Sequence, residues 1–152
     1  MRTGKYRSLA WVAAVIGGLG GISSAQAGDL TVILDGVAHD QGGLRVGLYD
    51  RAETFRKEDR AAAIRTAAAI RTAAARPGQA SIGFGPVPAG RYAIMAYHDE
   101  DGDGGLDRFM GMIPTEGYAL SNDPEVSGPP AFDECAFDIP AEGRTITLKV
   151  RY

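Results

Sequence analysis

The sequence is poor in the residues that build disulfides and many catalytic centres. Its 152 residues contain one cysteine, Cys135, and two histidines, His39 and His98. A single cysteine excludes an internal disulfide, and two histidines exclude a histidine-rich set of metal ligands. The chain also has no serine in a nucleophile-elbow pattern and no glycine-rich phosphate loop. These absences argue against the common hydrolases and nucleotide-binding enzymes, so we expect a protein that is not an enzyme.

The N-terminal segment predicts export. Basic residues at positions 2, 5 and 7 precede an apolar run over 9–22, and Ala25-Gln26-Ala27 is a small-x-small cleavage pattern. The run is too short and too rich in glycine to favour a membrane span. We therefore expect a cleavable signal peptide at residues 1–27 and a periplasmic or secreted protein. The alternative is an uncleaved anchor.

The rest of the chain, residues 28–152, has the length of a single domain. Loss of the three basic residues in the signal segment would change the formal net charge from −3 to −6. An acidic domain has no general attraction for nucleic acid. We expect a monomer without a nucleic-acid partner or a membrane span, which binds an unidentified envelope component or a polar ligand.

Alternating apolar residues predict a chain built mostly of strands. We expect strands at residues 30–34, 44–49, 81–84, 91–98, 134–139 and 145–152. The 91–98 strand is apolar on both faces, which suits a central position. Cys135 alternates with Phe137 and Ile139, which favours a small buried thiol over a nucleophile. Short strands between glycine and proline turns predict an all-β fold, an antiparallel Ig-like or transthyretin-like β-sandwich.

Residues 51–76 are the predicted exception, a helical excursion from the sandwich. Asp50 and Glu53 have the spacing of a helix cap, and the alanine-rich run that follows has high helix propensity. Within it, residues 62–67 recur unchanged as 68–73. The segment carries a formal charge of +4, so it can contact anionic envelope lipid or polysaccharide. The alternative, which its weak apolar stripe favours, is a solvated helix against the acidic body.

The residues after the 91–98 strand carry a metal-binding pattern. An EF-hand loop aims oxygen ligands from alternate residues at one cation, and a glycine at its sixth position allows the turn. Here Gly104 is the sixth residue, and the carbonyl of Gly105 can serve as the seventh-position ligand. We expect a calcium-type site with the ligands Asp99, Asp101, Asp103, Gly105 and Asp107.

The pattern is incomplete at its twelfth position. Met110 stands where an EF-hand has a bidentate glutamate, which predicts weak binding with a dissociation constant of about 10⁻⁴ to 10⁻³ M. The alternative is a bare turn of aspartate and glycine. Four carboxylates so close together repel one another unless a cation or solvation offsets their charge, and this favours the metal site.

A long crossing segment at 111–133 offers further functional residues. Glu116 is a candidate either to complete the ion shell or to bind a polar ligand beside Tyr118. The alternative is that Ile113, Tyr118 and Phe132 only pin the segment to the body. By strand alternation His98 is a packed histidine, or else a metal ligand or base paired with Asp99 or Glu116. An enzyme would therefore use His98 and Glu116 as a small metal-dependent or hydrolytic site.

Several motifs in one order resemble a known family. They are Pro88-Ala89-Gly90-Arg91-Tyr92, the 98–104 run, Gly111-Met112-Ile113-Pro114-Thr115-Glu116-Gly117-Tyr118, Ser121-Asn122 and Gly128-Pro129-Pro130. The chain resembles the bacterial exported family of unknown function numbered 2141 over nearly all of 30–150. The resemblance implies an exported sandwich of transthyretin-like or immunoglobulin-like type, and it implies no established activity.

Overall fold

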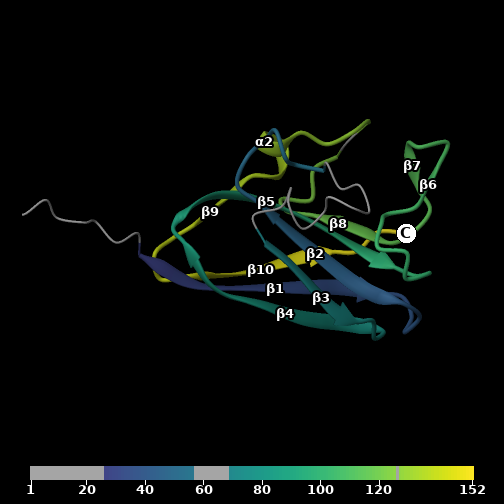
Figure 1. Cartoon of the computed structure of the whole chain (residues 1–152), viewed down its shortest axis with the longest axis horizontal. Helices are drawn as coiled ribbons and strands as arrows, with labels where there is room; N and C mark the ends of the chain where they lie inside the picture. Colours follow the sequence, from purple (N-terminus) through teal and green to yellow (C-terminus); the bar gives the residue numbers. More distant parts are fainter. Residues whose placement is uncertain (1–25, 57–68, 126) are drawn as a thin grey trace, which may run out of the picture.

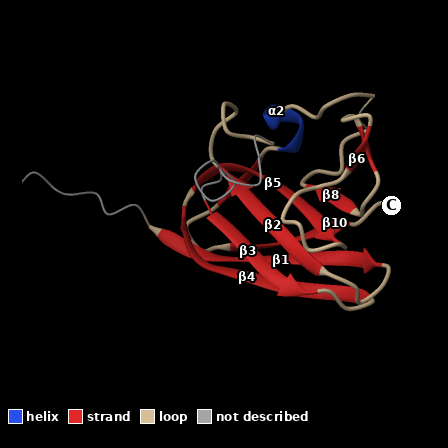
Figure 2. Cartoon of the chain, turned by 45° about the vertical axis from the view of Figure 1, so that its right-hand side comes forward, coloured by secondary structure: helices blue, strands red, loops and turns tan. Residues whose placement is uncertain are grey.

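The structure, a computed structural model, describes residues 26–56, 69–125 and 127–152. The predicted signal peptide at 1–27 therefore lies almost wholly outside the described residues. The first copy of the alanine-rich repeat, at 62–67, lies outside them as well. Within the described residues, the chain forms two main sheets that lie one over the other (Figures 1 and 2).

Three strands make the first sheet and five make the second. The first sheet has the order β10-β1-β4, with β1 at Ala27–Val37, β4 at Gly78–Pro88 and β10 at Arg144–Lys149. The second has the order β3-β2-β5-β8, with β3 at Ala69–Ala74, β2 at Gly43–Tyr49, β5 at Gly90–Asp99 and β8 at Tyr118–Leu120. The fifth strand of this sheet is β9 at Phe137–Ile139, which also pairs with β5. A separate two-stranded hairpin consists of β6 at Arg108–Phe109 and β7 at Ile113–Pro114.

The main core lies between the sheets, and β5 contributes to it with one of its faces. Leu30 and Val32 of β1 meet Val46 of β2 and Ile94 of β5 in one buried cluster. The opposite face of β5 enters a second cluster, in which Met95 packs with residues that include Tyr49, Phe55, Leu120 and Cys135. Every residue of β5 from 92 to 99 is buried. The prediction of a central strand that is apolar on both faces is confirmed.

The predicted all-β, antiparallel fold is confirmed with one exception. β2 pairs antiparallel with β3 and β5, and β1 pairs antiparallel with β4. β1 and β10, however, run parallel, with Leu34 opposite Leu148. A parallel pair needs a long connection, and here nearly the whole domain lies between the two strands. The Ig-like and transthyretin-like detail stays a prediction.

The helix predicted for 51–76 is wrong at its C-terminal end. Residues 52–56 form turns, and residues 69–74 form β3 at the edge of the second sheet. Arg71 lies over the Phe84 ring, with its Cζ 5.3 Å from the ring centroid, and donates a hydrogen bond to the Phe84 carbonyl. Pairing with β2 and packing on β4 thus override the helix propensity of alanine. Three of the seven basic residues on which the predicted envelope contact rests, Lys57, Arg60 and Arg65, lie outside the described residues, and the contact stays a prediction.

The strand predicted at 134–139 is shorter in the structure and begins only at Phe137. Residues Phe132–Cys135 form the short helix α2, and only Phe137–Ile139 form β9. Glu134 accepts a hydrogen bond from the Ala131 amide, which fixes the first turn of the helix. Figure 2 shows α2 above the second sheet, where it covers β5. Cys135 is fully buried as predicted, although it sits on this helix.

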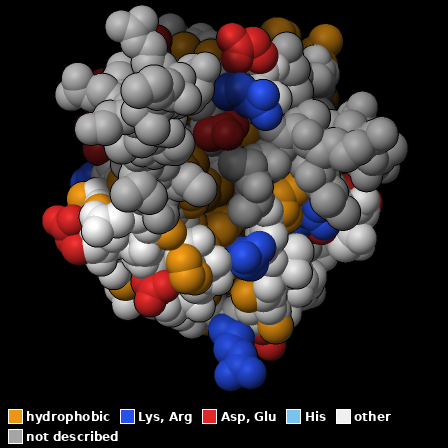
Figure 3. Space-filling model, turned by 60° about the vertical axis from the view of Figure 1, so that its left-hand side comes forward, with side chains coloured by type: hydrophobic (Ala, Val, Ile, Leu, Met, Phe, Trp, Pro, Cys, Tyr) orange, Lys and Arg blue, Asp and Glu red, His pale blue; other side chains and the backbone are white. Residues whose placement is uncertain are grey.

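The face of the molecule that Figure 3 shows is mixed in charge. In the view of Figure 3, acidic and basic side chains are interspersed with small hydrophobic patches. Among the residues that the structure describes, none of the helices has both the length and the apolar character that a membrane crossing requires.

Ser121 and Asn122 close a gap along β5. β2 pairs with one edge of β5, and Leu48 lies opposite Ile94 there. On the other edge, β8 pairs at Met95–Tyr97 and β9 pairs at Gly90–Tyr92, so neither strand reaches Ile94. The Ile94 amide donates to Ser121 Oγ at 2.8 Å, and Ser121 Oγ donates to the Cys135 carbonyl. Asn122 donates to the Ala136 carbonyl at 2.7 Å. These two side chains replace the missing strand between β8 and β9.

We predict that Ser121→Ala lowers the free energy of unfolding by about 1–3 kcal/mol, because it leaves the buried Ile94 amide without a partner. Chemical denaturation followed by far-UV circular dichroism measures the change. Ser81→Ala, at an exposed position of β4, is the matched control and should change stability by less than about 0.5 kcal/mol. Equal effects of the two substitutions would contradict the bridging role of Ser121.

Candidate functional site

The acidic loop lies where β5 leaves the second sheet. We call residues 99–107 the acidic loop; it continues into the β6–β7 hairpin, and the chain then returns through 115–117 to β8. The returning segment is bound to the strand exit, since the His98 amide donates to the Gly117 carbonyl at 2.7 Å. Figure 1 places this hairpin beside the C-terminus.

Glu116 holds the two ends of the acidic loop together. Its Oε1 accepts a hydrogen bond from the Glu100 amide at 2.8 Å, and its Oε2 accepts one from the Asp107 amide at 2.9 Å. The side chain is nearly buried, at 6% exposure. The backbone adds a third contact, in which the Thr115 amide donates to the Asp107 carbonyl at 2.9 Å. The return segment therefore fixes both ends of the loop.

The aspartates of the loop fold back on its own amides. Asp99 Oδ2 accepts from the Gly104 amide at 3.1 Å, and Asp101 Oδ1 accepts from the Asp103 amide at 3.0 Å. Asp103 Oδ1 accepts from the Gly105 amide at 2.7 Å. Gly104 has a φ of 85°, which is the left-handed conformation that glycine adopts most readily. Such side-chain turns are typical of aspartate in loops.

The carboxylates come together in two overlapping groups. Oxygens of Asp99, Asp101 and Glu116 lie within 4.8 Å of one another, and so do oxygens of Asp101, Asp103 and Asp107. Asp101 belongs to both groups. The structure thus brings the four predicted aspartates together, with Glu116 as the fifth carboxylate. The Gly105 amide is bound to Asp103, and the role of the Gly105 carbonyl as a ligand stays a prediction.

One oxygen in this cluster is buried without a partner. Asp99 is 6% exposed, and its Oδ1 makes no hydrogen bond. A close approach of the 40–42 turn encloses this corner, because a Cβ on Gly42 would lie 1.9 Å from the Asp99 carbonyl oxygen. Elsewhere in the loop, Tyr97 donates its hydroxyl hydrogen to the Gly104 carbonyl at 2.9 Å. The acidic loop is therefore supported by the 40–42 turn and by a side chain of β5.

Of the three residues expected to pin the crossing segment to the body, two pack against the core and one is exposed. Phe132 and Tyr118 pack against the second core cluster, as the pinning interpretation predicts. Ile113 is 62% exposed in the hairpin and pins nothing there, since β6 and β7 pair only with each other. Met110, at the twelfth position of the motif, is 77% exposed.

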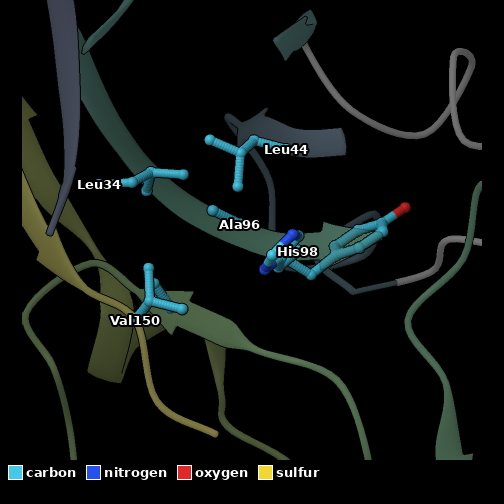
Figure 4. A pocket seen from close by; sticks show the side chains of 7 residues that line it. Leu34, Leu44, Ala96, His98 and Val150 are labelled. Carbon is cyan, nitrogen blue, oxygen red and sulfur yellow. The ribbon is translucent and has the colours of Figure 1, made fainter. Parts of the chain in front are cut away.

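His98 is a packed histidine with both ring nitrogens engaged. Nε2 lies 2.7 Å from the Gln41 carbonyl oxygen, and Nδ1 lies 2.7 Å from the Tyr152 hydroxyl. Its ring contacts neither Asp99 nor Glu116 by a hydrogen bond, unlike the pairing that an acid–base site would use. Figure 4 shows the ring beside the apolar side chains of Leu34, Leu44, Ala96 and Val150. The crevice that they line has no room for a water molecule.

The surroundings of His98 could not be found from local sequence. The His39 and His98 ring centroids are 4.6 Å apart, and His39 Nε2 lies 3.2 Å from Glu100 Oε2. Tyr152 also accepts a hydrogen bond from the Ala38 amide at 2.9 Å. Burial of its hydroxyl raises the pKa of Tyr152; the Ala38 hydrogen bond lowers it and the Glu100 charge raises it. These contacts join residues 54 and more positions apart, so the only local signal was the presence of two histidines.

Comparison with known proteins identifies a family and no activity. The family model described as "Uncharacterized protein conserved in bacteria (DUF2141)" matches residues 32–147, which is most of the chain. This match confirms the resemblance seen in the order of motifs. No curated protein and no solved structure matches the chain.

We predict that Glu116→Gln lowers the free energy of unfolding by about 1–3 kcal/mol, because an amide side chain offers one acceptor where two backbone amides need one each. Urea denaturation in the presence of a chelator measures the change without a contribution from metal. The exposed Glu142→Gln is the matched control. A variant more stable than the wild type would mean that repulsion among the carboxylates outweighs the hydrogen bonds of Glu116.

We also predict that Cys135 is inert in the folded protein. Burial raises the pKa of its thiol to about 11, with Glu134 adding to the rise and Arg56 opposing it. Because the thiolate is the reactive form, a thiol reagent at pH 8 should label the protein only in denaturant. The raised pKa also means that the folded state keeps this proton longer, so stability should fall as the pH rises from about 9 towards 11. Rapid labelling of the folded protein would contradict this burial.

Proposed function

We propose that this chain, which belongs to the DUF2141 family of uncharacterized bacterial proteins, is an exported β-sheet module whose acidic loop binds a calcium-type cation. The module binds or organises a component of the envelope and performs no reaction. The cation fastens the exit of β5 to the segment that returns to β8. The observation that carries the proposal is the buried, unpartnered oxygen of Asp99.

A buried carboxylate oxygen without a partner is unfavourable in the absence of a ligand. Leaving such a group unsatisfied costs about 1–3 kcal/mol or more when the group is charged. Asp99 has no room to turn into solvent, because it is 6% exposed and its Oδ2 is held by the Gly104 amide. A cation in the space shared with Asp101 and Glu116 would give the Asp99 carboxylate a further partner.

The donor set favours a hard cation. The clustered side chains offer carboxylate oxygens alone, and Ca²⁺ takes six to eight oxygen ligands in flexible geometry. Thiolate or imidazole ligands, which would favour transition metals, are absent from both carboxylate groups among the described residues. Each carboxylate oxygen has two lone pairs, so Glu116 can accept its backbone hydrogen bonds and still contact an ion.

The bound ion would serve to stabilise the fold more than to transmit a calcium signal. Both groups of carboxylates sit between β5 and the 115–117 return, where Glu116 already bridges the ends of the loop. Without a twelfth-position glutamate the expected dissociation constant is about 10⁻⁴ to 10⁻³ M. Such a site is filled where calcium is abundant, which is consistent with the export that the 1–27 pattern predicts.

We predict that about 5 mM Ca²⁺ raises the melting temperature of the purified protein by several degrees. At the expected affinity, binding to the folded state alone adds about 1–2 kcal/mol of stability. Mg²⁺ at the same concentration should have a smaller effect, because it prefers fewer protein ligands in stricter octahedral geometry. Differential scanning calorimetry in chelated buffer provides the baseline.

Asp101→Asn tests the site itself, because Asp101 belongs to both carboxylate groups and its side chain is exposed. The variant should fold and should lose most of the calcium-dependent rise. Asp138→Asn, an exposed substitution on β9, is the matched control and should retain the full rise. A wild-type melting temperature that calcium leaves unchanged would overturn the proposal.

A further inference from the structure

We infer that a second metal site, for a borderline transition ion such as Zn²⁺, lies beside the acidic loop and is formed by His39, His98 and Glu100. One ligand atom from each of the three residues lies within 4.8 Å of the others. They come from the 38–42 connection and from the end of β5. The site shares no residue with the two carboxylate groups and differs from them in donor chemistry.

The hydrogen bonds of His98 present one nitrogen as a ligand. The Gln41 carbonyl oxygen can only accept a hydrogen bond, so Nε2 carries the proton and donates it across 2.7 Å. Nδ1 then keeps its lone pair and accepts from the Tyr152 hydroxyl at 2.7 Å. Metal-ligating histidines are commonly oriented in this way, with the remote ring N–H on a backbone carbonyl or carboxylate. His98 is thus preset to coordinate through Nδ1.

His39 and Glu100 already have the spacing of two ligands on one ion. His39 Nε2 lies 3.2 Å from Glu100 Oε2. Atoms bound tetrahedrally to Zn²⁺ at about 2.0–2.1 Å lie about 3.3–3.4 Å from each other. The other nitrogen of His39, Nδ1, is buried without a hydrogen-bond partner. The His39 ring is thus held at Nε2 by Glu100 and makes no hydrogen bond at Nδ1, and its centroid lies 4.6 Å from that of His98, so an ion between the two rings and Glu100 would find His39 close by.

Tyr152 occupies the position that the ion would take at Nδ1. Its hydroxyl also accepts the Ala38 amide hydrogen, and the residue as a whole is 58% exposed. The ring can therefore withdraw into solvent, and the ion replaces its hydroxyl hydrogen at Nδ1. Two imidazoles and one carboxylate form a three-residue ligand set of the kind that Zn²⁺ accepts with a fourth, open position. Such a mixed set suits Zn²⁺, Cu²⁺ or Ni²⁺ better than Ca²⁺.

The test uses protein without an affinity tag and ZnCl₂ as the probe. We expect isothermal titration calorimetry to show one Zn²⁺ per chain, bound more tightly than about 1 mM. Because the sequence has two histidines, their ring nitrogens can be followed separately by ¹⁵N NMR, and the Nδ1 resonance of His98 should move to the position of a metal-bound nitrogen. His39→Gln and Glu100→Gln should each weaken binding by about tenfold or more.

The acidic loop supplies the matched control. Asp101→Asn should leave the Zn²⁺ affinity unchanged, and His39→Gln should leave the calcium-dependent rise in melting temperature unchanged. The inference is overturned if no Zn²⁺ binds below about 1 mM, if His39→Gln binds as the wild type does, or if the His98 Nδ1 resonance does not move. It is also overturned if Asp101→Asn weakens Zn²⁺ binding as much as His39→Gln does, because the ion would then sit on the acidic loop.

Discussion

The acidic loop depends on one carboxylate that accepts a backbone hydrogen from each of its ends. Glu116 receives the amides of Glu100 and Asp107, and this contact turns an excursion of the chain into a closed ring. Within the ring, Asp99, Asp101 and Asp103 accept amides of the loop itself. The negative charges consequently gather on a fixed frame. On a flexible segment the carboxylates would separate, because like charges repel one another and separated carboxylates are better solvated.

That frame is rigid because β5 is buried on both faces. The core between the sheets holds one side of the strand, and α2 with the 52–56 turns covers the other. The gap between β8 and β9 would weaken this arrangement at Ile94, but Ser121 and Asn122 bridge it with their side chains. The burial continues through His98 and Asp99. The strand therefore delivers its last two side chains to defined positions, one on each face.

The sequence predicts those structural features that depend on residues close together along the chain. The apolar pattern of 91–98 and the spacing of the aspartates are local, and the structure has a central strand and clustered carboxylates at these positions. Contacts between distant residues were not predictable in the same way. The parallel pairing of β1 with β10 and the pairing of the 69–74 strand with β2 depend on partners far away in the sequence. The packing of Tyr152 on His98 likewise joins the chain's last residue to the middle of the domain.

Strand alternation explains why two different donor sets can lie so close together. Successive side chains of a strand point to opposite faces, so Asp99 faces the all-carboxylate cluster while His98 and Glu100 face His39. A hard cation prefers the first set and a borderline ion prefers the second, and the two sites would not compete for one metal. They share the peptide groups between His98 and Glu100, and the Glu100 amide is itself bound to Glu116. An ion at either site would restrain this shared backbone, while two neighbouring cations would also repel each other. Whichever effect is larger, linkage makes the coupling equal in both directions.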